Sequence, residues 1–149
     1  MVQTAAGSEL ARVVVVDAQG AQLLDLLVRP SGPVLDYRTR WSGMTAERLE
    51  GAAHDLEAAR AEVRRLVSSS TLVVAHSGEN DLRALRLVHT RVLDTAVLFM
   101  GGRSRRSKLS LKSLAFEHLG SVIQQGSHEP LEDARAALAL ARLVVRQRG

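Results

Sequence analysis

The chain has 149 residues and a formal net charge of +4, and its length suits one domain with a single hydrophobic core, covering residues 1–149. Hydrophobic residues make up 46% of it, but its apolar stretches are far shorter than the roughly 20 residues of a membrane-spanning helix, and its first residues lack a secretory-signal pattern, so we expect no membrane partner. It contains no cysteine, which excludes disulfide frameworks, zinc fingers and cysteine nucleophiles and favours an intracellular setting, in the nucleus or the cytoplasm.

The first half of the chain predicts a hairpin followed by helices. Residues 10–17 are rich in β-branched side chains and are followed, after a turn at 18–20, by the leucine-rich residues 22–29, so we expect a β-hairpin. An arginine-bearing loop is predicted over 36–43. Thr45 precedes a short helix, and residues 55–67 carry apolar side chains at spacings of three and four, which predicts an amphipathic helix.

The second half predicts a buried strand and further helices. Residues 71–75 are apolar and β-branched, a helix is expected to open at Asn80 and Asp81 with its apolar face reaching Val88, and a brief strand is expected at 92–93. Asp94 is the expected N-cap of a helix over 96–100. Two more helices are predicted over 110–119 and 130–146, the last with Pro130 in its first turn. This order indicates an α/β chain whose strand pairing is partly antiparallel.

Basic residues are concentrated in one part of the chain. Between Leu82 and Phe116 there is one acid, Asp94, and there are eight basic residues: Arg83, Arg86, Arg91, Arg103, Arg105, Arg106, Lys108 and Lys112. Such a segment favours a polyanionic partner. The aromatic residues are Tyr37, Trp41, Phe99 and Phe116, too few for a sheet of exposed rings that stacks bases in addition to a core, so nucleic acid would have to be bound by another means.

Three polar residues stand at positions that suit catalysis: Asp81 follows a buried strand, and His128 precedes Asp133 by five residues. In two-metal nucleases, carboxylates at strand ends and helix starts hold two Mg²⁺ or Mn²⁺ ions about 3.5–4 Å apart. A loop histidine can take the proton from an attacking water, because imidazole titrates near neutral pH. Taken singly, each residue also has a structural explanation, since aspartates often cap helices and loop histidines are often merely exposed. Their combination favours a catalytic site.

Several segments of the chain resemble one family of nucleases. They are LARVVVVD, DYRTRWSGMTAERLEG, VVAHSGENDLRAL, LSLKSLAFEHLG and IQQGSHEPLEDARAALAL. In order and spacing they are similar to the DEDDh 3′-to-5′ exonucleases, in the eukaryotic branch of RNA exonucleases that includes the interferon-stimulated exonuclease. The resemblance implies a ribonuclease-H-like fold, in which a mixed sheet is flanked by helices. It also implies two Mg²⁺ or Mn²⁺ ions as cofactors and removal of nucleotides from a 3′ end, usually of single-stranded RNA.

The resemblance implies a role for each of the three candidate residues. Asp81 matches the aspartate of the second family motif, which is a metal ligand. Asp133 matches the final metal-binding aspartate, and His128 matches the general-base histidine. The expected reaction is an in-line attack of an activated water on the terminal phosphodiester.

The resemblance and the charge pattern also indicate substrate-binding residues. Arg38 matches an arginine that lies near the terminal nucleotide in this branch, and Met1 stands where the match begins. Arg103, Arg105 and Arg106 belong to the basic segment and are placed to hold phosphates. For Arg38 and for the basic segment a solvated loop is the alternative interpretation.

The first family motif is not found in this sequence. Members of the branch carry Asp-x-Glu-Met-Val on their first strand, whereas the matching stretch here begins at Met1 and Val2. That strand lies between the hairpin at 10–29 and the strand at 71–75 in the family's sheet, so we expect a fold that lacks its central strand, an opened core and an N-terminally truncated exonuclease domain. With two of four acids, we also expect weak metal binding and little or no catalysis. The alternative function is a non-catalytic nucleic-acid-binding or scaffold domain.

Overall fold

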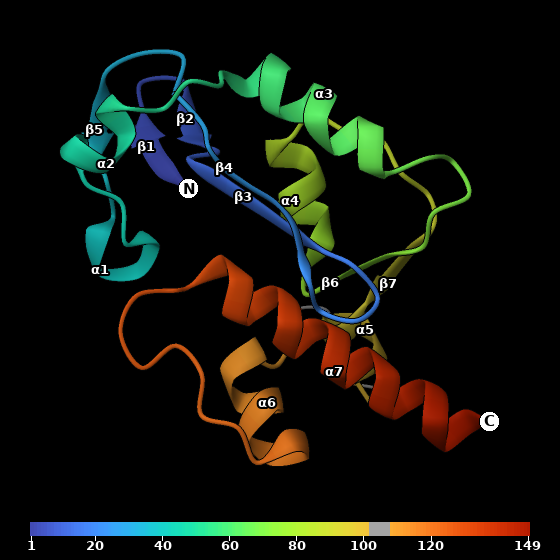
Figure 1. The fold of residues 1–149 in the computed structure, drawn as a ribbon. Coiled ribbons are helices and arrows are strands. Elements are labelled where there is room, and N and C mark those ends of the chain that lie inside the picture. The colour runs from blue at the N-terminus through green and yellow to red at the C-terminus, as the bar shows by residue number, and fades with distance from the viewer. Residues whose placement is uncertain (102–107) are drawn as a thin grey trace.

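The computed structural model of the protein describes residues 1–101 and 108–149 and begins with a small antiparallel sheet (Figure 1). Strand β1 (Val2–Thr4) lies in the middle of this sheet, between β2 (Gly7–Glu9) and β5 (Val34–Asp36). Sequence analysis identified none of these three strands. Val2 is fully buried against Ala11, which anchors the small sheet to the rest of the fold.

The predicted hairpin is formed by β3 (Arg12–Val16) and β4 (Gln22–Leu27), which pair antiparallel. Asp17 closes its turn, because its side-chain oxygen accepts hydrogen bonds from two backbone N–H groups, those of Gln19 and Ala21. The turn is held on the last helix, where the carbonyl of Gly20 accepts a 2.9 Å hydrogen bond from Arg135.

Three helices follow the hairpin. Helix α1 (Thr39–Ser42) lies within the segment predicted to be a loop, while α2 (Ala46–Glu50) and α3 (Leu56–Leu66) were predicted. Asp55 caps α3 by accepting a 2.9 Å hydrogen bond from the N–H of Ala58, and the helix buries Ala59 and Val63 against the hairpin.

A parallel pair of strands forms next, β6 (Val73–Ala75) with β7 (Val92–Asp94). Parallel neighbours need a crossover connection, and α4 (Gly78–Ala84) provides it. Helix α5 (Thr95–Leu98) starts directly after β7.

The chain ends with α6 (Leu111–Leu119) and the long α7 (Pro130–Arg148), which packs against α5, α6, β3 and β6 (Figure 1). Leu114 and Leu140 are fully buried in the core between α6 and α7. Within the described part of the chain, no helix combines the length and apolar character needed to cross a membrane.

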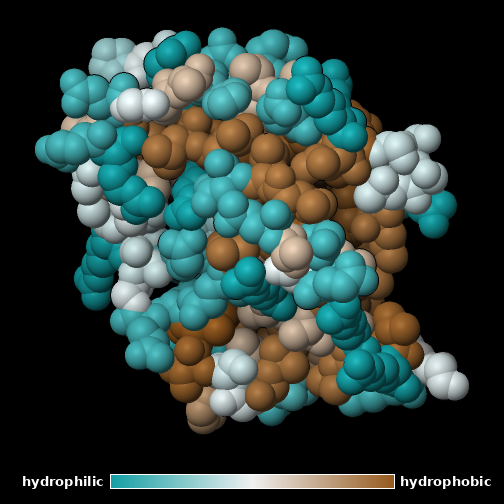
Figure 2. Space-filling model, viewed as in Figure 1, coloured by the Kyte–Doolittle hydropathy of each residue, from teal (hydrophilic) through white to brown (hydrophobic). Residues whose placement is uncertain are grey.

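The two-stranded pairs are not joined into one sheet. In the described residues β3 pairs with β4 and β6 pairs with β7, and no strand lies between β3 and β6. Every residue of β3, β6 and β7 is only half-buried. Figure 2 accordingly shows hydrophobic side chains at the surface over the β3–β4 hairpin and below α3. This arrangement is what the expected absence of a central strand predicts, and α7 is the element that packs against both pairs.

Candidate functional site

Asp94 fixes the start of the helix that carries the first candidate residue. One carboxylate oxygen, Oδ1, accepts hydrogen bonds from the N–H groups of Ser77 (2.8 Å) and Ala96 (2.9 Å), and Oδ2 accepts one from Gly78 (3.0 Å). The expected N-cap role of Asp94 is therefore confirmed, and it extends to the start of α4. The backbone of Ser77 has a left-handed conformation, and Gly78 is the first helical residue of α4. The prediction that this helix starts at Asn80 is therefore wrong by two residues.

Asp81 lies one turn inside α4. Taken over the whole residue, Asp81 is exposed, but protein surrounds its carboxyl group. This burial is the main reason why the pKa of Asp81 is raised from 3.8 to about 6. The negative charges of Asp94 and Asp133 also raise this pKa. The two carboxylates predicted as metal ligands thus lie near enough to repel each other.

Asp133 and His128 meet at the start of α7. Asp133 accepts a 2.8 Å hydrogen bond from the side-chain amide of Gln124, and its other oxygen lies 3.7 Å from Nδ1 of His128. Burial raises the pKa of Asp133, whereas Gln124 and His128 counteract that rise. The His128 side chain is 51% exposed, so its ring stands at the surface beside a half-buried carboxylate.

Arg38 and Met1 lie near Asp81. The guanidinium of Arg38 donates hydrogen bonds to Ser8 Oγ (2.9 Å) and Gln3 Oε1 (2.6 Å), so the small N-terminal sheet holds it. Burial and the charge of Arg38 lower the pKa of the Met1 α-amino group, and the charge of Asp81 opposes this shift. The side chain of Arg38 is therefore held in place, and its role in substrate binding stays a prediction.

His76 is a further member of this region that sequence analysis missed. Its Nδ1 lies 3.0 Å from Oγ1 of the buried Thr95, and burial lowers the pKa of His76 while Asp94 and Asp133 counteract that effect. Its position directly after the predicted strand was the available signal. Gln124 was also missed, because no local pattern links it to a carboxylate nine residues later.

Backbone strain is concentrated around these residues. Among the described residues, four non-glycine positions have a positive φ: Arg38 (51°), Ser77 (55°), Arg86 (50°) and Gln124 (54°). Arg38, Ser77 and Gln124 all border the candidate site. Strained backbone persists only where surrounding contacts impose it, and it is enriched at functional sites.

The basic segment can be followed only in part. Arg103, Arg105 and Arg106, which were predicted to bind phosphates, lie outside the described residues. Lys108, which belongs to the same segment, pairs with Glu79 of α4 at 3.1 Å. This ion pair brings a later part of the basic segment to the helix that carries Asp81.

The described residues do not make a complete metal site. In residues 1–101 and 108–149, no group of three or more His, Cys, Asp or Glu side chains is arranged to hold a metal ion. Mg²⁺ prefers near-octahedral oxygen coordination. Asp81 and Asp133 alone would leave most of the coordination of two such ions to water, so the donor set does not fit the metal pair that the resemblance implies.

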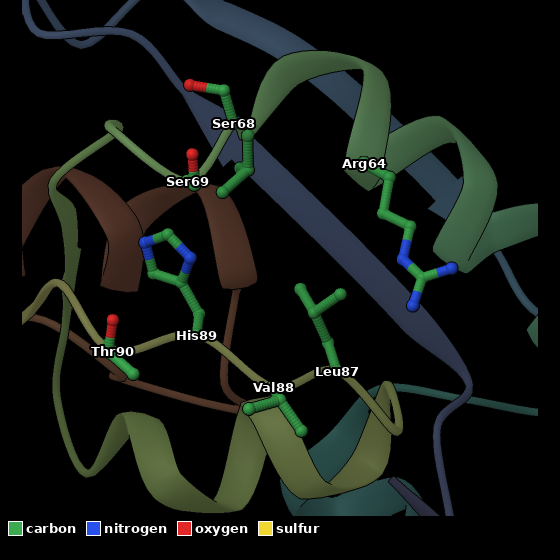
Figure 3. Close-up of a pocket in the computed structure, with 8 residues that line it drawn as sticks. Arg64, Ser68, Ser69, Leu87, Val88, His89 and Thr90 are labelled. Atoms are coloured by element: carbon green, nitrogen blue, oxygen red, sulfur yellow. The ribbon is translucent and has the colours of Figure 1, made fainter.

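Two surface hollows of the described residues lie elsewhere. One, of about 420 Å³, lies between the end of α3 and the segment before β7, where Arg64, Ser68, Ser69 and Leu87 surround it (Figure 3). His89 also lines it, but its Nε2 is engaged by the carbonyl of Thr71 at 2.8 Å. A second hollow, of about 530 Å³, lies between α6 and α7. None of the predicted catalytic residues lines either of these two hollows.

Known proteins similar to this chain were found by sequence and by structure. RNA exonuclease 3 of Yarrowia lipolytica is 39% identical over 150 aligned residues, a match that covers 95% of this chain and 20% of that protein. The Pan2 catalytic unit of Neurospora crassa superimposes with a TM-score of 0.89 at 29% identity, covering 99% of this chain and 26% of that one. A Saccharomyces cerevisiae Pan2 exonuclease module in complex with AAGGAA RNA gives a TM-score of 0.83 at 27% identity, covering 94% of this chain and 25% of that one. No family model matches the chain. The likeness confirms the predicted ribonuclease-H-like fold, and this chain spans a quarter or less of the length of most of these proteins.

Proposed function

Because the chain belongs to the eukaryotic RNA exonuclease family of the DEDD type, we propose that it acts on RNA as part of a 3′-to-5′ exonuclease. The observation that carries the proposal is that Asp81, from the middle of the chain, lies near Asp133 and His128, from its last quarter, and that Arg38 lies near Asp81. The related Pan2 module that was solved with RNA supports RNA as the partner.

Each residue of the candidate site has a role that its surroundings support. His128 would accept a proton from an attacking water, since its ring is exposed and Asp133, 3.7 Å away, stabilises the imidazolium that forms. Arg38 is held by Ser8 and Gln3 and carries a fixed positive charge toward the end of an RNA strand. The basic segment, which includes Lys108, would bind phosphates farther along the strand.

We propose Asp81 and Asp133 as two of the ligands for Mg²⁺ or Mn²⁺. They do not suffice for a metal pair, so no catalytic step is assigned to metal in this chain. A second function, RNA binding without cleavage, is favoured by that observation: the described residues hold no cluster of three metal-binding side chains. In that case the site would bind an RNA end through Arg38 and the basic segment.

One experiment separates the two functions. The chain is incubated with RNA labelled at its 5′ end, with and without Mg²⁺ or Mn²⁺, and the products are resolved at single-nucleotide steps. Stepwise shortening that requires metal and is lost in Asp133→Asn, but not in the exposed control Glu117→Gln, supports the exonuclease. Salt-sensitive RNA binding with intact RNA supports the second function, and the absence of both cleavage and binding refutes both.

A further inference from the structure

Trp41 is the single tryptophan of the chain, and its side chain is exposed beside the candidate site. It lies on α1 and is 58% exposed, although burying so large an apolar ring would be favourable. The guanidinium carbon of the neighbouring Arg40 lies 5.6 Å from the ring centroid, within the range of a cation–π contact. The chain thus presents a flat ring and a positive charge together at its surface.

The other aromatic side chains are differently placed. Tyr37 packs against the core that contains Val2, and Phe99 packs against the core of α6 and α7 and contacts the ring of His118. Phe116 is 65% exposed but lies on α6. Trp41 is therefore the exposed ring that adjoins the candidate site.

The backbone of Trp41 is joined directly to the loop that carries the proposed base. Its carbonyl accepts a 2.7 Å hydrogen bond from the N–H of His128. At the end of α1 the chain passes so close to this loop that a Cβ on Gly43 would lie 3.0 Å from Ser127 Oγ. In Figure 1, α1 lies beside the loop that leads into α7. The backbone of Trp41 is therefore fixed beside that of His128.

The helix that presents the ring is fixed by its own side chains. Ser42 donates a 2.6 Å hydrogen bond to the carbonyl of Tyr37, and Thr39 donates one of 2.6 Å to the carbonyl of the buried Met44. A preorganised aromatic surface loses little conformational entropy when a ligand stacks on it. The backbone that carries Trp41 is therefore fixed in place.

We propose that Trp41 and Arg40 form a stacking position for one nucleobase of the RNA strand whose end is held at Asp81, Asp133 and His128. The proposal rests on the proposed function, because it specifies how the same site binds its substrate. A base stacks on Trp41 through its π-face, so the position accepts any base, while Arg40 contacts the ring and the phosphate of that nucleotide. This single ring replaces the multi-ring platform for which the chain has too few aromatic residues.

Because Trp41 is the only tryptophan, its intrinsic fluorescence reports on this position alone. An unlabelled single-stranded oligoribonucleotide is added to the chain, and an abasic oligomer of the same length and inorganic phosphate serve as controls. We expect the base-bearing RNA to quench the fluorescence and both controls to leave it unchanged. Equal quenching by the abasic oligomer would overturn the stacking proposal.

Affinity is measured in parallel by the fluorescence anisotropy of a labelled oligoribonucleotide. We expect Trp41→Ala to bind about tenfold more weakly, Trp41→Phe to retain most of the affinity, and the control Phe116→Ala to bind like the parent. The stacking position is refuted if Trp41→Ala binds RNA like the parent and the tryptophan fluorescence of the parent is unchanged on adding RNA. That result leaves the proposed RNA function standing. Absence of RNA binding by the parent refutes both.

Discussion

Replacing Asp94 tests whether one carboxylate organises the starts of two helices. It accepts three backbone hydrogen bonds, one that caps α5 and two that hold the start of α4. An N-cap bond contributes about 1 kcal/mol, and each further bond to a charged acceptor contributes about 1.5 kcal/mol at the low end suited to a half-buried group. We therefore expect Asp94→Ala to lower the free energy of unfolding by about 4 kcal/mol.

Asp94→Asn provides a graded comparison. Its amide oxygen can keep the bonds from Ser77 and Ala96, but its NH₂ group would face the N–H of Gly78, so we expect a loss of about 1.5 kcal/mol. Removing the charge should also lower the pKa of Asp81, because Asp94 helps to raise it.

Urea unfolding monitored by circular dichroism measures these free energies, and the matched control is Asp55→Ala. Asp55 caps α3 through a single hydrogen bond, so its removal should cost about 1 kcal/mol. The reasoning is refuted if Asp94→Ala destabilises the protein no more than Asp55→Ala does. Should Asp94→Ala fail to fold, the free energy of unfolding of Asp94→Asn still has to be lower than that of the parent.

Three other predictions concern the same region. Gly78→Ala should destabilise the protein by about 1–3 kcal/mol in urea unfolding, because the new Cβ would lie 2.8 Å from Ala75, whereas Gly51→Ala, with open space around it, should have little effect. Gln124→Ala should raise the pKa of Asp133, measured by carboxyl NMR titration, because the 2.8 Å hydrogen bond that favours the charged form is lost. The raised pKa of Asp81 contributes stability that is present below about pH 4 and is lost as the pH rises through about 6. Asp81→Asn should therefore become more stable relative to the parent as the pH rises across that interval. A stability difference between the two proteins that does not change with pH would contradict this.

Sequence patterns predicted the elements that bury a regular apolar face. The β3–β4 hairpin, α3 and α7 appeared at nearly their true positions, because each is long enough for its periodicity to show. The strands β1, β2 and β5 have three residues each and show no period, so they were missed. The extension of α4 to Val88 was wrong: the helix ends at Ala84, Arg86 turns left-handed, and Val88 is 93% exposed.

The candidate site was predictable where the family pattern names a residue type at a fixed spacing. Asp81, Asp133 and His128 were found in this way, and their assigned roles stay predictions. Gln124 and His76 were not found, because their importance comes from contacts with residues that only the folded chain brings near. Local sequence encodes the N-caps of α3 and α5, whereas the start of α4 and the partners of the carboxylates depend on tertiary packing.

The separation of β3 from β6 has a consequence for the behaviour of the protein in solution. In the part of the chain that the structure describes, one edge of β3 lacks a strand partner, and Val13, Val14 and Val15 follow one another along it with Arg12 as the only charge of the strand. Such an edge offers unpaired N–H and C=O groups to any extended chain, and charged residues or prolines that normally block this pairing are scarce here. We expect intermolecular strand pairing, and with it aggregation, to set the upper limit of protein concentration, and a lysine placed at Val14 to raise that limit.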